Sequence, residues 1–142
     1  MKALFLTCVY FASAVALADD ECWRKEIDPS TRRIYQNAAQ WEADKKVLAA
    51  KYPPMPNLFN LQKGYRVGLE ESSNAARMRP DKRQHCYVGC RIANEAGHDV
   101  AVYAAFYKED KDINDCNPRT HYDLKDIDAT ISGADIARSA PG

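Results

Sequence analysis

The chain has 142 residues, with 20 lysines and arginines against 20 aspartates and glutamates, so its formal net charge is zero. This length suits one domain, and neither the charge balance nor any known motif indicates a nucleic acid partner. The charges are unevenly distributed, because residues 24–83 are basic overall and residues 95–142 are acidic overall. Either the basic part faces an anionic partner such as a cell-wall polymer, or the two parts face each other or solvent.

The first residues have the three parts of a secretory signal. Lys2 supplies the positive charge, residues 3–15 form an apolar stretch too short to cross a bilayer, and Ala16-Leu17-Ala18 resembles a cleavage site. We therefore expect residues 1–18 to be a signal peptide and residues 19–142 to form a single α-helical domain, located in the periplasm or secreted. No second apolar segment is long enough for a transmembrane helix.

Four cysteines follow the predicted signal: Cys22, Cys86, Cys90 and Cys116. An even number of cysteines in an exported protein predicts two disulfides. Cys86 and Cys90 project from one face of a predicted helix, where a bridge between them is geometrically awkward. We expect each of them to pair with a distant cysteine, Cys22 or Cys116, and the sequence leaves the pairing open.

The hydrophobic periodicity and the turn residues predict helices and loops, with no strand of useful length. Asp28 as N-cap and Pro29 at the first helical position open the first helix, in which Ile34, Trp41 and Leu48 form one apolar stripe. We expect this stripe to be buried against the helix that begins at Pro80. The predicted elements are an N-terminal arm over 19–27, a helix over 28–52, a loop and a short helix over 69–78, helices over 80–96 and 100–108, a loop over 109–119, and a last helix from Tyr122 or Asp123. The fold class is therefore all-α, a small bundle of about four to five helices stapled by two disulfides.

The stretch RPDKRQHCYVGCRIANEAGHD, residues 79–99, holds the candidate catalytic residues. Asp81 and His85 lie one helical turn apart on the same face, and Glu95 flanks that face. A carboxylate beside an imidazole can orient it as a general base. In the alternative interpretation, His85 is a half-buried structural residue held by Asp81 and packed toward residues 129–133. A nucleophilic pair of His85 and Cys86 is disfavoured, because side chains of adjacent helical residues diverge.

Two metal sites were considered and neither is expected. Zinc could use donors from the set His85, Cys86, Cys90, Cys116 and His121, but the cysteine spacing is not typical of zinc sites and an oxidising compartment favours disulfides. Calcium could use a loop that starts with Asp110, Asp112 and Asn114. That match fails because Asp115 stands where a calcium loop needs glycine and His121 where it needs a bidentate glutamate. We therefore expect no metal and no cofactor.

Two segments resemble an uncharacterised helical module of exported bacterial proteins and of the C-termini of rearrangement-hotspot-type proteins. They are DKRQHCYVGCRIANEAG and DLKDIDATISGADIA, within residues 81–137. The module has the pattern D-K-x-x-H-C-x-x-S-C-x-I-A followed by D-x-x-D-I-x-A-N-x-x-G. This chain departs from it at Gly89, where the module has serine, and at Thr130, where it has asparagine. The resemblance implies an exported or interbacterial setting and implies no reaction.

These observations favour a small exported bacterial protein that acts by protein or cell-envelope interaction, as a periplasmic partner, an inhibitor or an immunity-type protein. The alternative is a hydrolase that acts on a cell-envelope polymer, with His85 as base, Asp81 orienting it and Glu95 nearby. An enzyme should hold His85 and an acidic partner in an open cleft. A binding module should bury His85 and expose an apolar or charged patch elsewhere, whereas a structural scaffold should do neither.

Overall fold

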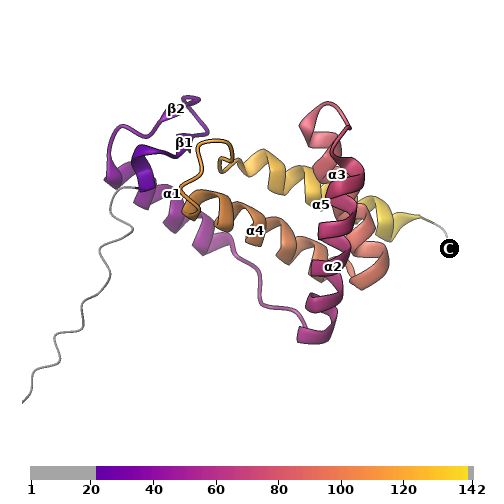
Figure 1. Ribbon diagram of the computed structural model, residues 1–142. Helices are drawn as coiled ribbons and strands as arrows, with labels where there is room; N and C mark the ends of the chain where they lie inside the picture. Colours follow the sequence, from indigo (N-terminus) through magenta and orange to yellow (C-terminus); the bar gives the residue numbers. More distant parts are fainter. Residues whose placement is uncertain (1–21, 141–142) are drawn as a thin grey trace, which may run out of the picture.

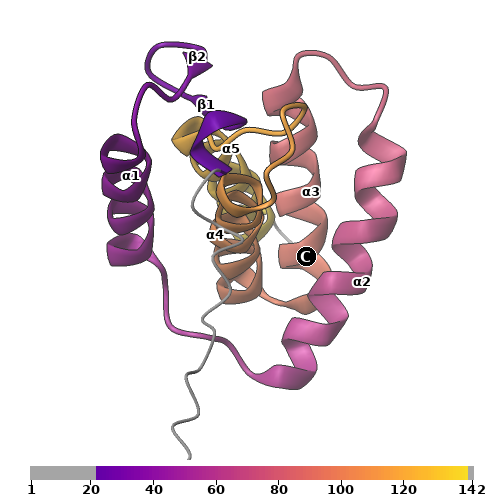
Figure 2. The same cartoon turned by 60° about the vertical axis from the view of Figure 1, so that its left-hand side comes forward.

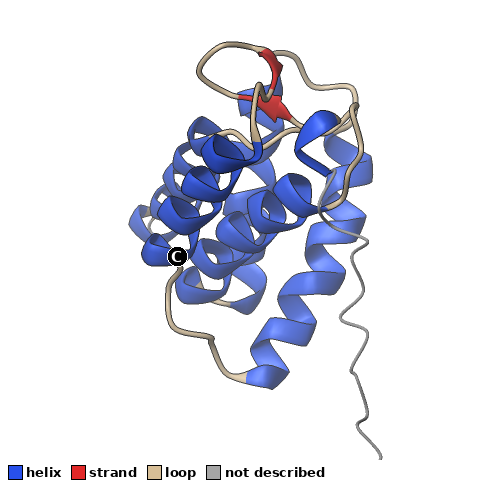
Figure 3. Cartoon of the chain, turned by 90° about the vertical axis from the view of Figure 1, so that its left-hand side faces the viewer, coloured by secondary structure: helices blue, strands red, loops and turns tan. Residues whose placement is uncertain are grey.

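The computed structural model describes residues 22–140, which fold into five α-helices and a small two-stranded hairpin (Figures 1 and 3). The predicted all-α class is confirmed. The elements are the 3-10 helix η1 (Cys22–Arg24), the strands β1 (Ile27–Asp28) and β2 (Arg33–Ile34), and the helices α1 (Ala38–Lys51), α2 (Leu58–Ala75), α3 (Asp81–Ala96), α4 (His98–Asn114) and α5 (Leu124–Ser139). The predicted signal peptide, residues 1–18, lies outside the described residues. No helix within residues 22–140 has the length and apolar character needed to cross a membrane.

Helix α4 occupies the middle of the bundle, with α1 on one side and α3 and α2 on the other (Figure 2). Helix α5 packs against both α3 and α4, and α2 packs mainly on α3. One buried cluster joins α1, α4 and α5 through side chains that include Trp41, Leu48 and Ile113. A second cluster joins α3, α4 and α5 through Ile92 and Val100, among others. The bundle therefore has two adjoining cores that share the central helix.

The helix predicted over residues 28–52 is wrong over its first part, residues 28–37. Asp28 does not cap a helix. Its side chain instead accepts hydrogen bonds from the backbone N–H and the hydroxyl of Ser30, at 2.8 and 2.6 Å, which stabilises a turn between β1 and β2. The helix begins at Ala38, because Asn37 is the N-cap and accepts from the N–H of Gln40 at 2.9 Å.

The apolar stripe expected on this helix is confirmed in part. Trp41 and Leu48 are buried, whereas Ile34 lies on β2 and is 53% exposed. The burial is against α4 and not against α3, since the indole Nε1 of Trp41 donates to the carbonyl of Ile113 at 3.0 Å. Helical spacing therefore identified the buried face of α1 but not the helix that covers it.

Two other boundaries differ from the predictions. Helix α2 spans Leu58–Ala75, where a loop and a short helix were expected, and α4 continues to Asn114, through part of the expected loop. Gly64 lies within α2, where the lack of a side chain allows close packing. A Cβ added there would lie 2.4 Å from a methyl of Val100. The predicted helix at 80–96 is confirmed as α3, which ends at Gly97 with φ +109°. The last helix begins as predicted, with Asp123 as its N-cap.

The expectation of two disulfides is wrong, because the structure has one within the described residues. Cys22 is bonded to Cys116 with a Cα–Cα distance of 4.9 Å, which ties η1 to the connection between α4 and α5. Neither cysteine is then available to α3, so Cys86 and Cys90 are free, partly exposed thiols. They belong to the segment of α3 that α5 crosses, since a Cβ added to Gly133 would meet backbone atoms of both.

Candidate functional site

A close crossing of α3 and α5 determines the position of the site. Gly89 in α3 and Gly133 in α5 are both buried, and a Cβ added to Gly89 would lie 2.1 Å from the carbonyl oxygen of Thr130. The two backbones therefore touch without intervening side chains. One turn away on each helix, this contact brings His85 of α3 opposite Asp126 and Thr130 of α5.

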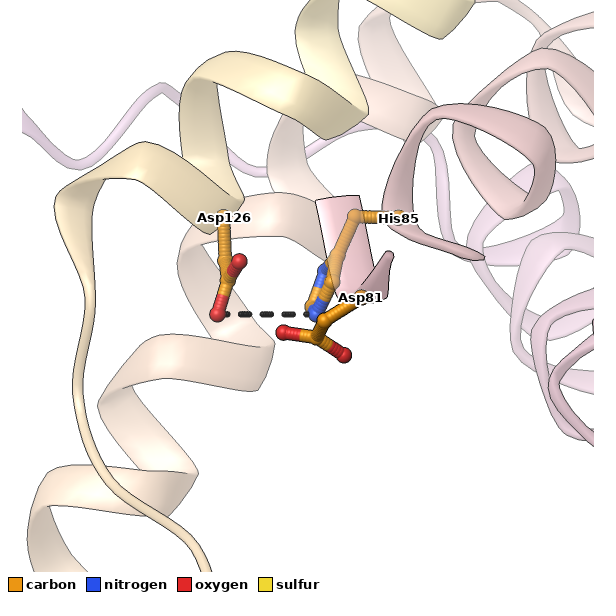
Figure 4. A group of neighbouring side chains, drawn as sticks. All are labelled: Asp81, His85 and Asp126. Atoms are coloured by element: carbon orange, nitrogen blue, oxygen red, sulfur yellow. Dashed lines mark ion pairs between the residues drawn. The ribbon is translucent and has the colours of Figure 1, made fainter. Parts of the chain in front are cut away.

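Each ring nitrogen of His85 has one polar neighbour on α5. Its Nε2 lies 3.5 Å from Oδ2 of Asp126, and its Nδ1 lies 3.5 Å from Oγ1 of Thr130 (Figure 4). The Thr130 hydroxyl donates to the backbone carbonyl of Asp126 at 2.9 Å. The His85 side chain is 20% exposed and that of Asp126 is 9% exposed, so the ring is half-buried and still reaches solvent.

Asp81 completes a group of three ionisable side chains. It lies one turn before His85 on α3, is exposed, and turns its carboxylate toward the imidazole (Figure 4). One ligand-type atom from each of Asp81, His85 and Asp126 lies within 4.8 Å of the others. The imidazole is thus placed between two carboxylates, one buried on α5 and one at the surface of α3.

Lys82 balances the negative charge of this group. Its ammonium group forms a hydrogen-bonded ion pair with Asp126 and another with Asp123 at 2.9 Å. Burial alone would lower the pKa of Lys82, but the bonds to these two carboxylates outweigh burial and raise it. Burial likewise opposes ionisation of Asp123, but its bond with Lys82 outweighs burial and lowers its pKa. Asp126 is therefore held in place by a fixed cation, with Oδ2 left to face His85.

Glu109 of α4 stabilises the N-terminus of α5. It is 1% exposed, and its carboxylate accepts a hydrogen bond from the backbone N–H of Asp123 at 2.7 Å. Burial raises the pKa of Glu109 to about 8, and the charges of Asp112 and Asp126 add to this effect. Together with Lys82, this contact fixes the first turn of α5 and so the position of Asp126.

The site opens into a cleft of about 450 Å³ between α2, α3, α4 and α5. Asp81, His85 and Thr130 lie at its polar end, and Lys108 and Lys111 of α4 also line it. The rest of the wall is mainly apolar and includes Leu69, Val88, Ile92 and Tyr107. A cleft of this volume is within the range of small-molecule sites.

The group of Asp81, His85 and Asp126 has donor types that divalent metals accept. Lys82, however, already binds one oxygen of Asp126 and neutralises part of the charge that would attract a cation. The five possible zinc ligands named from the sequence cannot all bind one ion, because Cys116 is bonded to Cys22. The arrangement is therefore better suited to acid–base chemistry by the side chains themselves than to holding an ion.

The structure brings together two of the three candidate catalytic residues and separates the third. Glu95 is 44% exposed on its side chain, at the far end of α3, and its carboxylate lies 3.7 Å from Nζ of Lys63 and 3.9 Å from Arg91. Asp126 and Thr130 were not among the candidates. The expectation that His85 packs toward residues 129–133 is confirmed, since Thr130 lies 3.5 Å from its Nδ1. Asp126, one turn before Thr130, was not anticipated.

No family model, curated protein or solved structure matches the chain. Function must therefore be inferred from the site itself.

Proposed function

We propose that this chain is an exported hydrolase that uses His85 as a general base. The observation that carries the proposal is the position of His85 between Asp126 and Asp81 in an open cleft. A carboxylate that orients an imidazole at the wall of a cleft is the arrangement that general-base catalysis requires. The apolar wall disfavours a polysaccharide substrate, so an ester of a cell-envelope molecule fits the cleft better.

The contacts of His85 define the role of each ring nitrogen. In the proposed mechanism the Asp126 carboxylate, 3.5 Å from Nε2, favours the tautomer with the proton on Nε2 and the lone pair on Nδ1. The hydroxyl hydrogen of Thr130 is directed at the carbonyl of Asp126, so this hydroxyl does not compete for that lone pair. Thr130 is also buried and serves to position the ring, not as a nucleophile.

The reaction balances with water as the only co-reactant. Nδ1 of His85 takes a proton from water while the water oxygen bonds to the ester carbonyl carbon. Collapse of the tetrahedral intermediate breaks the bond between that carbon and the alkoxy oxygen. The imidazolium then returns the proton to the leaving alkoxide, which gives a carboxylic acid and an alcohol. Asp126 stabilises the imidazolium that forms between these steps.

Action by protein or cell-envelope interaction is the second candidate, and one observation favours it. Helix α2 exposes Leu58, Phe59, Tyr65 and Leu69, each by more than half. Exposed apolar groups concentrated on one element are typical of binding surfaces. In this interpretation the chain is a periplasmic partner, inhibitor or immunity-type protein, and it has no hydrolytic activity.

A second histidine–aspartate pair provides the matched control that separates the two candidates. His98 Nε2 lies 2.8 Å from Oδ1 of Asp135, on the surface and away from the cleft. Hydrolysis of p-nitrophenyl esters should fall by a factor of roughly 10² or more in His85→Gln and stay near the parent rate in His98→Gln. Equal melting temperatures of the two variants would exclude unfolding as the cause. Absence of ester hydrolysis by the parent chain, or equal rates for both variants, would contradict the hydrolase and favour the interaction role.

A further inference from the structure

A second cavity extends the cleft away from His85. It has a volume of about 370 Å³ and lies between α2 and α4, where its wall is formed mainly by Leu58, Leu61, Tyr65, Tyr103, Ala104 and Tyr107. Tyr65, Ala104 and Tyr107 also line the cleft that holds His85. The two cavities share these side chains and so adjoin, and together they are called the groove, from Leu58 at one end to the His85 site at the other.

The groove exists because α2 and α4 diverge. Helix α2 packs mainly on α3 and only lightly on α4 (Figure 2). Ile92 of α3 lies beneath Gly64 and Gly68 of α2, so α3 forms part of the floor. Gly64 and Gly68 therefore bring α2 close to Ile92 of α3, and Gly64 also meets Val100 at the start of α4. A space remains beside the later turns of α4.

Large apolar side chains are highly exposed along this groove. Leu58 is 69% exposed, Tyr65 and Leu69 are each 58% exposed, and Tyr107 is 48% exposed. All four line the groove. Exposed apolar surface of this kind is unfavourable in water and is stabilised when an apolar ligand covers it.

The two ends of the groove differ in polarity. The end at Leu58 is almost wholly apolar, whereas the other end carries His85, Asp81, Lys108 and Lys111. Lys108 is paired with Asp112, and Lys111 is exposed at the rim. Asp81 on the α3 side is a carboxylate, so a ligand that complements both ends has an aliphatic chain and an anionic head group on the α4 side. Lys111 supplies the positive charge there, because Asp112 offsets that of Lys108.

We propose that the groove binds the acyl chain of an anionic lipid ester, with the ester group at His85 and the anionic head toward Lys108 and Lys111. This proposal rests on the proposed hydrolase function and names its substrate class. A partner helix is a poorer fit at the Leu58 end of the groove, because one helical turn about 10 Å across occupies about 400 Å³ and this end holds about 370 Å³. An extended chain of methylenes follows a groove of this size more closely.

The test uses dodecyl phosphate, a single-chain anionic amphiphile without an ester, added below its micelle concentration to the full chain. Isothermal titration calorimetry should detect saturable binding that strengthens roughly threefold to fourfold per methylene between the hexyl and dodecyl phosphates. Dodecyltrimethylammonium, with the same chain and a cationic head, should bind at least tenfold more weakly. Affinity that does not depend on chain length, or equal binding of the two head groups, would overturn the proposal.

Two groove variants and one control locate the binding. Ala104→Trp fills the part that both cavities share and should weaken dodecyl phosphate binding tenfold or more. Leu58→Gln with Leu69→Gln changes only exposed side chains, so it tests the groove even if Ala104→Trp fails to fold. Val47→Gln is the matched control, since Val47 is 44% exposed on α1 outside the groove. Binding that survives both groove variants, or that Val47→Gln weakens equally, places the ligand elsewhere.

The same measurement separates this proposal from the hydrolase. Dodecyl phosphate has no ester, so its binding is measured independently of any hydrolysis. Binding without ester hydrolysis would leave the groove assignment intact and contradict only the catalytic role. Ester hydrolysis that is independent of chain length and insensitive to Ala104→Trp would support the catalytic role and overturn the groove.

Discussion

A Cβ atom on Gly133 of α5 would lie 1.8 Å from the backbone carbonyl oxygen of Cys86 in α3. The reciprocal position, Gly89 in α3, would place its Cβ 2.1 Å from the carbonyl oxygen of Thr130 in α5. Both distances are far inside van der Waals contact with a backbone atom, which cannot rotate away. Glycine at these two positions therefore determines how closely α5 approaches α3, and with it the contact between Asp126 and His85.

Gly133→Ala should separate the two helices and destabilise the fold. A methyl group forced against a packed backbone costs about 1–3 kcal/mol, and more where neither helix can shift. Gly68→Ala is the matched control, because its Cβ would meet only the terminal Cδ1 of Ile92 at 3.4 Å and alanine favours the helix. Thermal unfolding should show a lower melting temperature for Gly133→Ala and an unchanged or higher one for Gly68→Ala. Equal melting temperatures would contradict the backbone contact.

Structural features were predicted correctly where the residues that determine them are close in sequence, and incorrectly where those residues are far apart. The helix at 81–96 was predicted because proline, a first-turn aspartate and Gly97 are all close in sequence. Only the C-terminal part of α2 was predicted as helix, because its first part depends on close packing of Gly64 and Gly68 against Val100 and Ile92. Burial of Trp41 followed from its periodicity, but its contact with Ile113 is 72 residues away and has no local signature.

The candidate site was predictable on α3 and only in part on α5, where residues 129–133 were expected near His85 and Asp126 was not. Asp81 and His85 share a helix face, so their i,i+4 spacing is visible in the sequence. Asp126 joins them only through the crossing at Gly89 and Gly133, which depends on tertiary packing. The disulfide pairing failed for the same reason, since nothing near Cys22 in sequence indicates that η1 lies beside Cys116.

Removal of the disulfide should lower stability substantially. Cys22 and Cys116 are 94 positions apart, so the bridge constrains a long loop in the unfolded chain. Replacing both with serine should cost about 2–5 kcal/mol, measured by denaturant unfolding. Replacing the free Cys86 and Cys90 with alanine should leave the effect of a reducing agent on the melting temperature unchanged. Non-reducing peptide mapping that links Cys86 or Cys90 to another cysteine would show the assigned pairing to be wrong.

Trp41 should be among the most sensitive positions of the first core. It is 3% exposed, its indole donates to Ile113, and the ammonium of Lys45 lies 3.7 Å from its ring centroid. Trp41→Ala should reduce the free energy of unfolding by about 3–5 kcal/mol. Trp41→Phe keeps an aromatic ring and loses the hydrogen bond, so it should cost less than Trp41→Ala. Equal losses in the two variants would contradict the importance of ring packing.

The last prediction concerns Glu26, which is fully buried and whose carboxylate oxygens make no hydrogen bond of normal geometry. The pKa of Glu26 is raised from 4.5 to about 7, mainly by burial and then by the nearby charges of Asp115 and Asp112. Peptide groups of Cys116 and Asn117 offset part of this shift. The folded chain therefore holds a proton on Glu26 at pH values where the unfolded chain has lost it. Stability must then fall as the pH rises from about 4.5 to about 7, and change little from this group above that range.

Glu109 also lowers the stability of the fold as the pH rises to about 8, because burial raises its pKa. The lowered pKa values of Asp28, Glu71 and Asp123 act at more acidic pH and do not oppose this trend above about pH 5. Glu26→Gln removes the ionisation, so it should raise stability at pH 8 by about 1–3 kcal/mol and have a smaller effect at pH 5. Glu95→Gln, an exposed control, should leave the pH profile of the melting temperature unchanged. A profile for Glu26→Gln that runs parallel to that of the parent between pH 5 and 8 would show that Glu26 is ionised throughout.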